Sequence, residues 1–553
     1  KYLMQGENLE KIQKILKQTF GFEQFKTNQQ EPILELCKDR PSDILCIYPT
    51  SAGKSLIYQL PTVYKQQCTI VISPLISLMS DQITKLRYLK LRAFSYSSDD
   101  SMNSHQDLFQ AASNSKIDFI FTTPESFQND YFKQIISKIK MTVGLIAVDE
   151  CHVITEWGKS FRPAYRNLKI IRDTLPNVPI IALTASTTYH NAIQICSSLA
   201  IENPKIFVQS FNRSNIHYNV WHKNSQMSKK DMLLQTINKF ISMYPQRSIL
   251  IYTSTRQEAE DLESFLSQYQ ESYFYHAGLQ SDQKQILLQQ WQNNQVKLII
   301  ATIAFAMGID KASVGLVIHY CLPKGMEGFY QESGRAGRDG EQSFSLVLVD
   351  NQDVNFRTQN VTKEDEYDQF SYYYLLLMLT SQTCKRKQIH KYFKSGHQFE
   401  SQENCCDVCC QQQLFKGLFG VQDLQNESVV KGVEAQITQL KTRIVRGSLI
   451  KLFQEEDTNE EAEAKEKPSG LQKKIVELHR KLCAESRKKM GTFIIEDLEA
   501  QMQKVTDYIK VKAQTDLHID ECGKRLIGFM NRSKMTFSIK QLEMEVFRFF
   551  VGK

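Results

Sequence analysis

The loop at residues 49–55 has the residue types and the spacing needed to hold a triphosphate. It reads Pro-Thr-Ser-Ala-Gly-Lys-Ser and follows an apolar run at residues 44–48. A tight loop that opens a helix points backbone N–H groups at phosphates. Lys54 would neutralise the β- and γ-phosphate oxygens, and Ser55 would hold Mg²⁺. A Gly-Lys-Ser sequence alone is nearly as likely to be a chance surface turn as a phosphate-binding loop. Its interpretation therefore depends on a second motif. The nucleotide-binding candidates in this loop are Thr50, Ser51, Ala52, Gly53, Lys54 and Ser55.

The second motif, Asp-Glu-Cys-His, ends another apolar run at residues 143–148. A strand that is apolar on both sides is typical of the centre of a parallel sheet. Such a strand would bring Asp149 to the metal ion and Glu150 to the attacking water, with His152 closing the motif. Together the two motifs predict a site that hydrolyses a nucleoside triphosphate.

Three later segments can complete such a site. Residues 183–186 (LTAS) carry hydroxyl groups that would couple the nucleotide site to a second substrate. Residues 301–311 supply an apolar strand and then Asp310, which would face the cleft. The sequence QESGRAGRDG places Arg335 and Arg338 at i and i+3. On one face of a helix these arginines can reach a triphosphate, although a solvated basic helix end is the alternative.

The composition is that of a multidomain protein without a membrane segment. At 553 residues the chain is too long for one core, so about three to five domains are expected. Hydrophobic residues make up 42% and charged residues 23%, and a net charge of +7 permits a nucleic-acid partner without requiring one. No apolar run approaches bilayer length, and no signal-peptide pattern opens the chain. Because the chain begins at Lys1 and not at Met, we expect a fragment that would lack any targeting segment.

Short apolar runs alternate with helical stretches in two successive parts of the chain. This rhythm is typical of parallel α/β sheets. We therefore expect two α/β units, at residues 1–210 and 211–352, with ligands bound between them at the carboxyl ends of the strands. The expected strands are residues 44–48, 69–73, 119–122, 143–148 and 180–184 in the first unit, and 248–252, 272–276, 297–301, 316–320 and 343–348 in the second.

The rest of the chain divides into shorter segments. Residues 353–410 are helical and aromatic in pattern and end in a cluster of cysteines. Residues 411–453 are mixed in character, and the acidic stretch 454–470 is expected to be a disordered linker, with a charged helical surface as the alternative. Residues 471–553 recover helical periodicity and are expected to form a small, mostly helical domain.

The thirteen cysteines fall into two groups. Eight are scattered in apolar or helical contexts, where buried free thiols are usual. In a chain of intracellular character, the clustering of the other five indicates a metal site before it indicates disulfides. These five are Cys384, Cys405, Cys406, Cys409 and Cys410.

In order and spacing, the motifs over residues 20–350 resemble those of the RecQ family of superfamily 2 DNA helicases. The resemblance implies two tandem RecA-like parallel-sheet lobes that bind ATP between them. The family's upstream glutamine reads adenine, and the matching residues here are Gln29 and Lys26. Gln331 and Asp310 would join the nucleotide site. The residues that the resemblance implies for hydrolysis are Lys54, Asp149, Glu150, His152, Arg335 and Arg338.

The same resemblance places DNA contacts on three segments. Residues 73–79 and 122–125 match two strand-binding motifs, and residues 157–163 (WGKSFRP) are similar to the family's aromatic-rich loop. Aromatic side chains in that loop would stack on bases, so that binding of a DNA strand would affect the hydrolytic site. Packing of these aromatic side chains between the lobes is the alternative. The implied DNA-contacting residues are Ser73, Pro74, Thr123, Trp157, Phe161 and Arg162.

Four departures from the family pattern leave the charges and the metal ligands in place. ATPase activity is therefore expected to be retained. The departures are Ser51-Ala52 for a run of glycines, Cys151 for alanine, Lys159-Ser160 for His-Asp, and Ala306 for glycine.

The cysteine cluster resembles the zinc site of the Werner-type branch of the family. Cys384 lies in a Cys-Lys-Arg sequence close to the family's Cys-Arg-Arg. The resemblance implies a tetrahedral Zn²⁺ bound by Cys384, Cys405, Cys406 and Cys409. Cys410 is then a spare thiol, and His397 is the replacement ligand if Cys405 points away. The metal would fasten the helices of residues 353–400 to the second lobe.

After the cysteines the resemblance weakens. The family continues with a winged-helix domain, and residues 411–453 would hold a short or degenerate version of it unless a segment is absent from this sequence. Residues 471–553 loosely resemble the helical HRDC module, which binds DNA or protein, and a winged-helix remnant is the competing interpretation.

The resemblance implies an ATP-dependent DNA helicase that translocates 3′→5′ on single-stranded DNA and acts in repair, recombination and replication. Its cofactors would be ATP, Mg²⁺ and Zn²⁺. Its partners would be single-stranded and forked DNA, with single-strand-binding protein and topoisomerase III as candidate proteins and no membrane. A monomer is favoured, located in the nucleus of a eukaryote or otherwise in the cytoplasm or nucleoid. An RNA helicase and an ATPase-dead DNA-binding scaffold are the alternatives.

Overall fold

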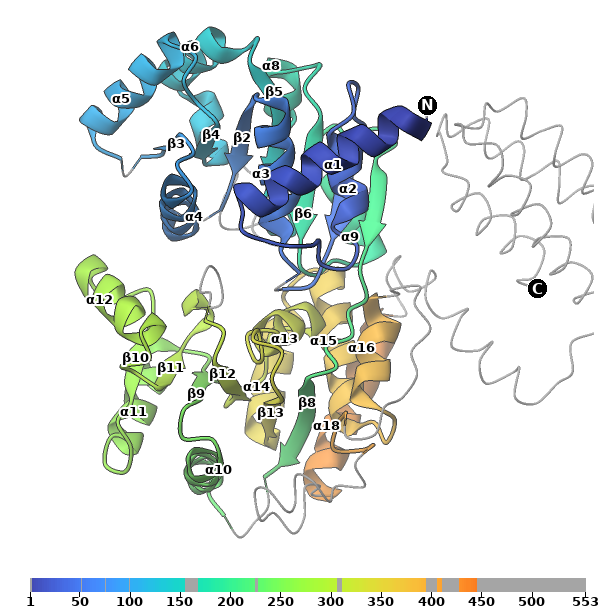
Figure 1. Cartoon of the computed structure of the whole chain (residues 1–553). Coiled ribbons are helices and arrows are strands. Elements are labelled where there is room, and N and C mark those ends of the chain that lie inside the picture. The colour runs from blue at the N-terminus through green and yellow to red at the C-terminus, as the bar shows by residue number, and fades with distance from the viewer. Residues whose placement is uncertain are drawn as a thin grey trace, which may run out of the picture. The chain divides into compact units, whose positions relative to one another are not determined.

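Two parallel β-sheets, one after the other in the chain, organise the part of the protein that this computed structural model describes (Figure 1). The described residues are 2–50, 52–74, 76–98, 100–154, 168–223, 227–305, 311–393, 405–409 and 427–444. All of them lie in the first of two compact units, residues 1–444, and the second unit comprises residues 445–553.

The first sheet has seven parallel strands in the order β3-β4-β2-β5-β6-β1-β7. Strands β1, β2, β4 and β6 are buried along their whole length, as expected for a parallel sheet covered on both faces. The strands are β1 (Ile44–Ile47), β2 (Cys68–Ile72), β3 (Ala93–Tyr96), β4 (Phe119–Thr122), β5 (Val143–Val148), β6 (Ile180–Thr184) and β7 (Lys205–Val208).

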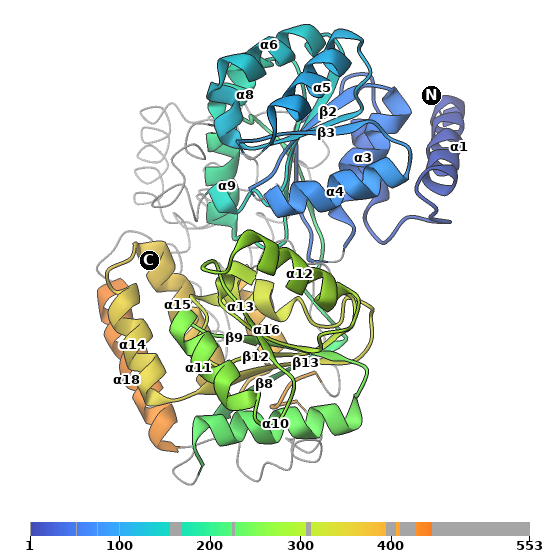
Figure 2. The same cartoon turned by 90° about the vertical axis from the view of Figure 1, so that its left-hand side faces the viewer.

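Helices lie on both faces of this sheet (Figure 2). Several begin where a side chain caps free backbone N–H groups, and in α5 and α6 the capping residues are Ser101 and Asn129. The helices are α1 (Tyr2–Gln18), α2 (Gln30–Leu36), α3 (Lys54–Lys65), α4 (Ile76–Tyr88), α5 (Met102–Ser113), η1 (Pro124–Gln128), α6 (Asp130–Ile139), α8 (Lys169–Thr174) and α9 (Tyr189–Ser198).

The second sheet has six parallel strands in the order β10-β11-β9-β12-β13-β8. Its strands are β8 (Ile216–His222), β9 (Ser248–Tyr252), β10 (Tyr273–Tyr275), β11 (Leu298–Ala301), β12 (Val314–His319) and β13 (Ser343–Val349). The helical segments around it are α10 (Lys229–Met243), α11 (Arg256–Leu266), α12 (Ser281–Gln292), η3 (Ile303–Phe305) and α13 (Met326–Ser333). The prediction of two tandem parallel α/β sheets is confirmed, and we call them the first and second lobes.

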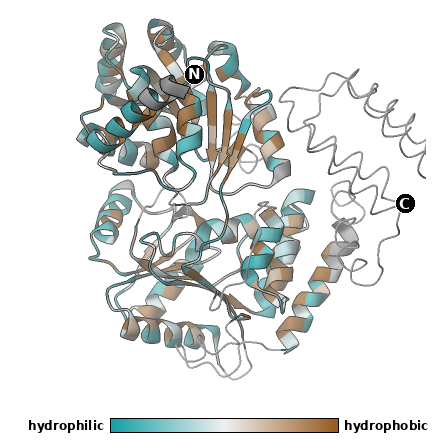
Figure 3. Cartoon of the chain, turned by 45° about the vertical axis from the view of Figure 1, so that its right-hand side comes forward, coloured by the Kyte–Doolittle hydropathy of each residue, from teal (hydrophilic) through white to brown (hydrophobic). Residues whose placement is uncertain are grey.

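Every strand expected from the sequence is present, within two residues at each end. Three further strands, β3, β7 and β8, were not expected, and each lies at an edge of its sheet. Edge strands carry polar residues that interrupt the apolar runs used to recognise central strands, as in β8, whose sequence is IHYNVWH. In Figure 3, hydrophobic residues predominate in the central strands of the first sheet, whereas the helices around it also carry hydrophilic residues.

A helical region follows the second lobe, as the sequence predicts for residues after 352. It comprises α14 (Asn351–Val361), α15 (Glu366–Thr380), α16 (Lys385–Phe393) and α18 (Glu427–Ile444). Buried Glu327 of α13 accepts hydrogen bonds from the hydroxyls of Tyr367, Ser371 and Tyr392, which ties α15 and α16 to the second lobe.

Helix α18 packs against α14 and α15. A Cβ atom on Gly432 would meet Asn351 Oδ1 at 2.1 Å, so this glycine permits the close approach of α18 to α14. The winged-helix interpretation of residues 411–453 stays a prediction, because only α18 is described there. The linker at 454–470 and the HRDC-like region at 471–553 lie outside the described residues. Among the helices that the structure describes, none has the length and hydropathy of a membrane span.

Candidate functional site

The loop between β1 and α3 has the backbone geometry that a phosphate-binding loop requires. Gly53 caps α3 with φ of 75° and ψ of 40°, a left-handed conformation that favours glycine. A Cβ atom at this position would also meet Gln29 Nε2 at 2.4 Å. Lys54 then opens the helix, and its ammonium lies 3.4 Å from the carbonyl of Tyr48 at the end of the preceding strand segment. Ser51 lies outside the described residues.

Gln29, the predicted adenine reader, lies against this loop. Its Nε2 donates to the carbonyls of Ala52 and Gly53 at 3.1 and 3.0 Å, and its Oε1 accepts from the backbone N–H of Lys26 at 2.8 Å. The side chain is only 2% exposed. Gln29 and Lys26 therefore lie beside the loop between β1 and α3, while their role in adenine recognition stays a prediction.

The acid pair follows β5 at the carboxyl edge of the first sheet. Glu150 has φ of 47°, which is uncommon for a residue other than glycine and typical of functional sites. Its backbone N–H donates to Asp149 Oδ1 at 3.0 Å. His152 Nδ1 lies 3.4 Å from Glu150 Oε2 and 3.1 Å from Thr184 Oγ1. Since Thr184 also donates to the carbonyl of Ser186 at 3.0 Å, His152 connects the acid pair to the 183–186 segment.

The two carboxyl groups have pKa values shifted in opposite directions. Burial and the charge of Glu150 raise the pKa of Asp149 to about 6. Burial also raises the pKa of Glu150, but electrostatic interactions with Lys54, His152, Arg335 and Arg338 outweigh this effect and lower the pKa overall. An ionised Asp149 is thus costly without a cation beside it, and its carboxylate together with the Ser55 hydroxyl is the hard-oxygen donor set that suits Mg²⁺. These residues fit the predicted metal.

Arg335 and Arg338 come from the second lobe, but not from a helix. Helix α13 ends at Ser333, and the two arginines lie in the turn that follows, in which Gly337 has φ of 60°. The expectation of a shared helical face was wrong, because both arginines lie beyond the end of α13. Their charges nevertheless help to lower the pKa of Glu150. Gly334, at the start of the same turn, accepts a hydrogen bond from Thr50 of the first lobe at 3.1 Å.

Other contacts connect the lobes around this site. Gln331 Nε2 donates to Ser186 Oγ at 2.9 Å, which brings a predicted nucleotide residue to the 183–186 segment. Thr188 Oγ1 lies 2.9 Å from the hydroxyl of Tyr367 on α15. Asp310 lies outside the described residues, as does Ala306.

The predicted DNA-contacting residues are described in part. Ser73 follows β2 and Thr123 follows β4, and because these parallel strands are neighbours, the two residues lie together at the carboxyl edge of the first sheet. Pro74 follows Ser73 at the same edge. Ser73 and Thr123 are 3% and 9% exposed, so their side chains offer little surface. The aromatic-rich loop, with Trp157, Lys159, Ser160, Phe161 and Arg162, lies outside the described residues.

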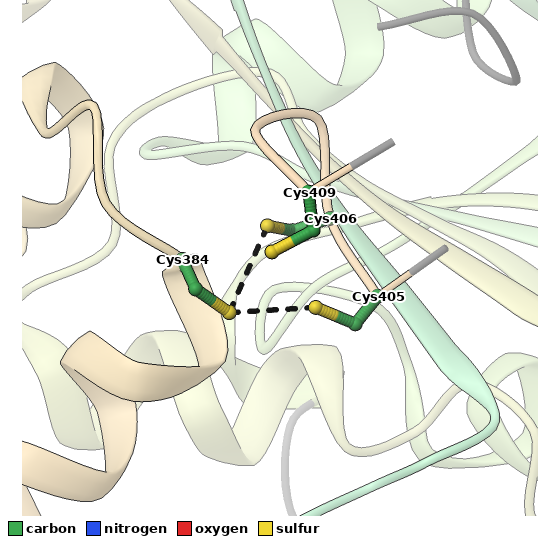
Figure 4. A group of neighbouring side chains, drawn as sticks. All are labelled: Cys384, Cys405, Cys406 and Cys409. Carbon is green, nitrogen blue, oxygen red and sulfur yellow. Dashed lines mark hydrogen bonds between the residues drawn. The ribbon is translucent and has the colours of Figure 1, made fainter. Parts of the chain in front are cut away.

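Four cysteines converge from two segments to form a second candidate site (Figure 4). Cys384 precedes α16, and the other three lie at residues 405–409. All four sulfur atoms lie within 4.8 Å of one another, with Cys384 Sγ 3.4 Å from Cys405 Sγ and 4.0 Å from Cys406 Sγ. Sulfur atoms around a tetrahedral Zn²⁺ are about 3.8 Å apart, given a Zn–S bond of about 2.3 Å. The four candidate ligands are Cys384, Cys405, Cys406 and Cys409.

Hydrogen bonding within the cluster favours a thiolate at Cys384, whereas burial raises the pKa of Cys409 to about 12. Hydrogen bonds with Cys405 and then Cys406 lower the pKa of Cys384 against the effect of burial. The backbone N–H of Lys385 points at Cys406 Sγ, at 3.4 Å. Cys405 and Asp407 bond to Tyr218 of β8, so the cysteine segment covers the edge of the second sheet. Cys410 and His397 lie outside the described residues.

The scattered cysteines agree with their interpretation as free thiols. Cys46, Cys68, Cys151 and Cys321 are buried and unpaired, and Cys196 is half-buried. Burial raises the pKa of Cys196 to about 11, which keeps this thiol neutral.

One residue of the site was not found from the sequence. Arg213, in the segment between the lobes, donates to Thr50 of the phosphate loop and to the backbone of the arginine turn. A single arginine before a strand has no local pattern that would mark it, and its contacts lie 121 to 163 residues away along the chain.

Comparison with known proteins places both lobes in helicase families. Residues 26–195 match the DEAD/DEAH box helicases, and residues 228–340 match the helicase conserved C-terminal domain. The chain is similar in fold to the structure of Saccharomyces cerevisiae Dbp5 bound to RNA and ADP BeF3, with a TM-score of 0.51 at 15% identity over 74% of this chain and 97% of that chain.

Similar sequences extend across most of the described residues. A protein of Acanthamoeba polyphaga mimivirus, named a "putative ATP-dependent RNA helicase", is 36% identical over 72% of each chain. The RecQ-like DNA helicase blm-1 of Caenorhabditis elegans is 33% identical over 80% of this chain and 46% of its own length. The ATP-dependent DNA helicase RecQ of Haemophilus influenzae is 32% identical over 71% of this chain and 63% of its own length.

This chain therefore spans less than two thirds of the latter two relatives. Two tandem parallel sheets, the helicase matches over both lobes, the four-cysteine cluster and these relatives agree on one assignment. The chain belongs to the RecQ family of superfamily 2 helicases.

Proposed function

We propose that this chain hydrolyses ATP to translocate 3′→5′ along single-stranded DNA and to unwind duplex DNA. The observation that carries the proposal is the position of Glu150 near cationic side chains of both lobes, Lys54 from the first and Arg335 and Arg338 from the second. Hydrolysis spreads negative charge over the transferring phosphoryl group, and prearranged positive charge stabilises it. Because the charges come from both lobes, the site is complete only when the lobes meet.

Each residue then has a defined task. Lys54 and the backbone of residues 50–55 bind the phosphates, and Gln29 leaves the loop carbonyls to bind adenine. Glu150 orients water and accepts its proton, and Arg335 and Arg338 stabilise the developing charge. Mg²⁺, held by Ser55 and Asp149, would neutralise phosphate charge. His152 contacts both Glu150 and Thr184, so a movement of Glu150 would displace Thr184 and the 183–186 segment.

The carboxyl edge of the first sheet supports the DNA part of the proposal. Ser73 and Thr123 mark one edge along which a strand would run, with Trp157, Phe161 and Arg162 as further contacts. Zn²⁺ bound by Cys384, Cys405, Cys406 and Cys409 would fasten α16 to the edge strand β8. Forked DNA, single-strand-binding protein and topoisomerase III are the proposed partners, and the nucleus the proposed location.

An RNA helicase is the second candidate, because one relative bears that name and the same two lobes serve both substrates. Steady-state ATP hydrolysis in the presence of matched single-stranded DNA and RNA distinguishes the two. We expect DNA to stimulate hydrolysis far more than RNA of the same sequence. Stimulation by RNA alone would assign the chain to RNA, and no hydrolysis with either would favour the ATPase-dead scaffold.

A further inference from the structure

The segment that joins the two lobes also holds the turn that carries the catalytic arginines. Arg213 Nη1 donates to the carbonyl of Gly334 at 3.1 Å. Its Nη2 donates to the carbonyls of Ala336 and Gly337 at 2.9 and 3.1 Å. These three carbonyls come from the residues on either side of Arg335. One guanidinium group therefore fixes the backbone from which that side chain projects.

The same guanidinium reaches the phosphate loop of the other lobe. Arg213 Nη1 donates to Thr50 Oγ1 at 3.2 Å, and Thr50 in turn donates to the carbonyl of Gly334 at 3.1 Å. A Cβ atom on Gly334 would lie 2.8 Å from Thr50 Oγ1, so glycine is needed for this approach. We call this set of contacts among Arg213, Thr50 and Gly334 the linker bridge.

The rest of the joining segment is anchored to the second lobe. Asn215 Nδ2 donates to the carbonyls of Gly337 and Glu341 at 2.7 and 3.0 Å. The hydroxyl of Tyr330 donates to the carbonyl of Phe211 at 3.1 Å. Arg213 thus has a rigid base, and its side chain is only 9% exposed.

We infer that Arg213 is the positioning residue that sets the Arg335–Arg338 turn against the phosphate loop. A planar guanidinium with five donors can serve four acceptors at once, whereas an ammonium group offers three donors from one point. A shift of Thr50 when the loop binds phosphate moves an acceptor of Arg213, and Arg213 transmits that shift to the turn. Arg213 does not touch the reacting atoms and acts through the position of Arg335. This inference rests on the proposed hydrolysis of ATP.

DNA-stimulated ATP hydrolysis by Arg213→Gln tests the inference. We expect kcat to fall by about 10- to 100-fold, the loss typical of a misplaced catalytic group, while KM for ATP changes much less. Arg213→Lys keeps the positive charge but lacks the planar guanidinium with its several N–H donors. Its kcat should therefore lie between those of Arg213→Gln and the wild type. In an Arg335→Ala background, Arg213→Gln should cause a much smaller further loss than it does alone, because one of the two residues that it positions is gone.

Arg172→Gln is the matched control. Arg172 is also a partly buried arginine that donates to backbone carbonyls, those of Pro176 and Val178, but its contacts stay within the first lobe. It should lower thermal stability comparably and leave kcat unchanged. If Arg213→Gln does not fold, Thr50→Val removes the other end of the linker bridge and should also lower kcat, with a much smaller further loss in the Arg335→Ala background.

Three results would overturn the inference. The first is a kcat of Arg213→Gln equal to that of the wild type. The second is a rise in the KM of Arg213→Gln for ATP with no change in kcat. The third is a kcat of the double variant that falls by the product of the two single losses. In each case the wild-type protein still hydrolyses ATP with DNA stimulation. A wild-type protein without such activity would instead refute the proposed function.

Discussion

At the scale of single residues, unusual conformations and charges gather in one small region. Glu150 has a positive φ, Gly53 is left-handed, and Asp149 is an acid that is hard to ionise without a cation. Such features cost free energy, on the order of 1–3 kcal/mol for each non-glycine residue in a rare conformation. Their concentration between Lys54 and the arginine turn is what a prearranged hydrolytic site requires.

Glu150→Gln is expected to bind ATP but to hydrolyse it about 10²- to 10⁴-fold more slowly, since an amide cannot accept the proton of water. Binding of a fluorescent ATP analogue and steady-state hydrolysis measure the two properties separately. Glu202→Gln, at an exposed glutamate, is the control and should match wild type. Near-normal hydrolysis by Glu150→Gln would remove Glu150 from its assigned role.

The sequence indicated those parts of the candidate site whose residues lie close together along the chain. Residues 49–55 and 149–152 are short contiguous motifs, so the order of their residues largely determines how their side chains and backbone groups are arranged. The helical placement of Arg335 and Arg338 was wrong because α13 ends at Ser333, and the i, i+3 spacing of the arginines does not show where a helix ends. Arg213 could not be predicted at all, because its acceptors are brought together only by the fold.

At the scale of elements, the central strands were predictable and the edge strands were not. Strands β3, β7 and β8 each have a neighbour on one side only and need other contacts. Strand β8 is covered by residues 405–407, and β7 begins at Lys205, whose ammonium contacts Glu35 of α2 at 2.5 Å. These supporting contacts are long-range, so a single sequence does not show them.

Glu35 gives the first lobe a measurable dependence on pH. Burial raises its pKa, but hydrogen bonds from Lys205, Lys38 and Ser42 outweigh this and lower the pKa from 4.5 to about 2. A carboxyl with a lowered folded-state pKa stabilises the protein above pH 4.5 and loses that contribution as the pH falls toward 2. Glu35→Gln should therefore lower the free energy of unfolding at neutral pH by about 1–3 kcal/mol.

Urea unfolding at neutral pH and at about pH 3 tests this linkage. The difference between wild type and Glu35→Gln should shrink at the lower pH, because the carboxyl of the unfolded wild type, with a pKa near 4.5, is protonated there while that of the folded protein is still mostly ionised. The control is Glu23→Gln, because the ion pair of Glu23 with Lys17 is exposed and should contribute little. An equal difference at both pH values would show that charge is not the cause.

At the scale of the whole molecule, the four cysteines join segments that a parallel sheet alone would leave apart. Residues 405–409 lie along β8, and Cys384 leads into α16, whose Tyr392 reaches the Glu327 network of the second lobe. A metal at this junction would stabilise the fold without entering the chemistry at the ATP site. The grouping of the four cysteines was predictable from spacing and family resemblance, while the pairing of residues 405–407 with β8 was not.

Elemental analysis of the purified protein should find one zinc per chain, held by the four cysteines. Cys406→Ser should lose the metal and lower the melting temperature, because the binding energy of a structural zinc is folding energy. Cys37→Ser, at a half-buried thiol in the first lobe, should keep the metal. A zinc-free wild-type protein of unchanged stability would contradict the assignment.

The central claim is that ATP hydrolysis between the two lobes drives the separation of DNA strands, and a forked-duplex unwinding assay tests it most directly. A duplex with a 3′ single-stranded tail should be opened by the wild-type chain in the presence of ATP and Mg²⁺, and a duplex with a 5′ tail should not. Lys54→Ala, which lacks the charge that holds the β- and γ-phosphates, should open neither. Strand separation by Lys54→Ala at the wild-type rate, or DNA-stimulated hydrolysis by the wild type without any strand separation, would contradict the account.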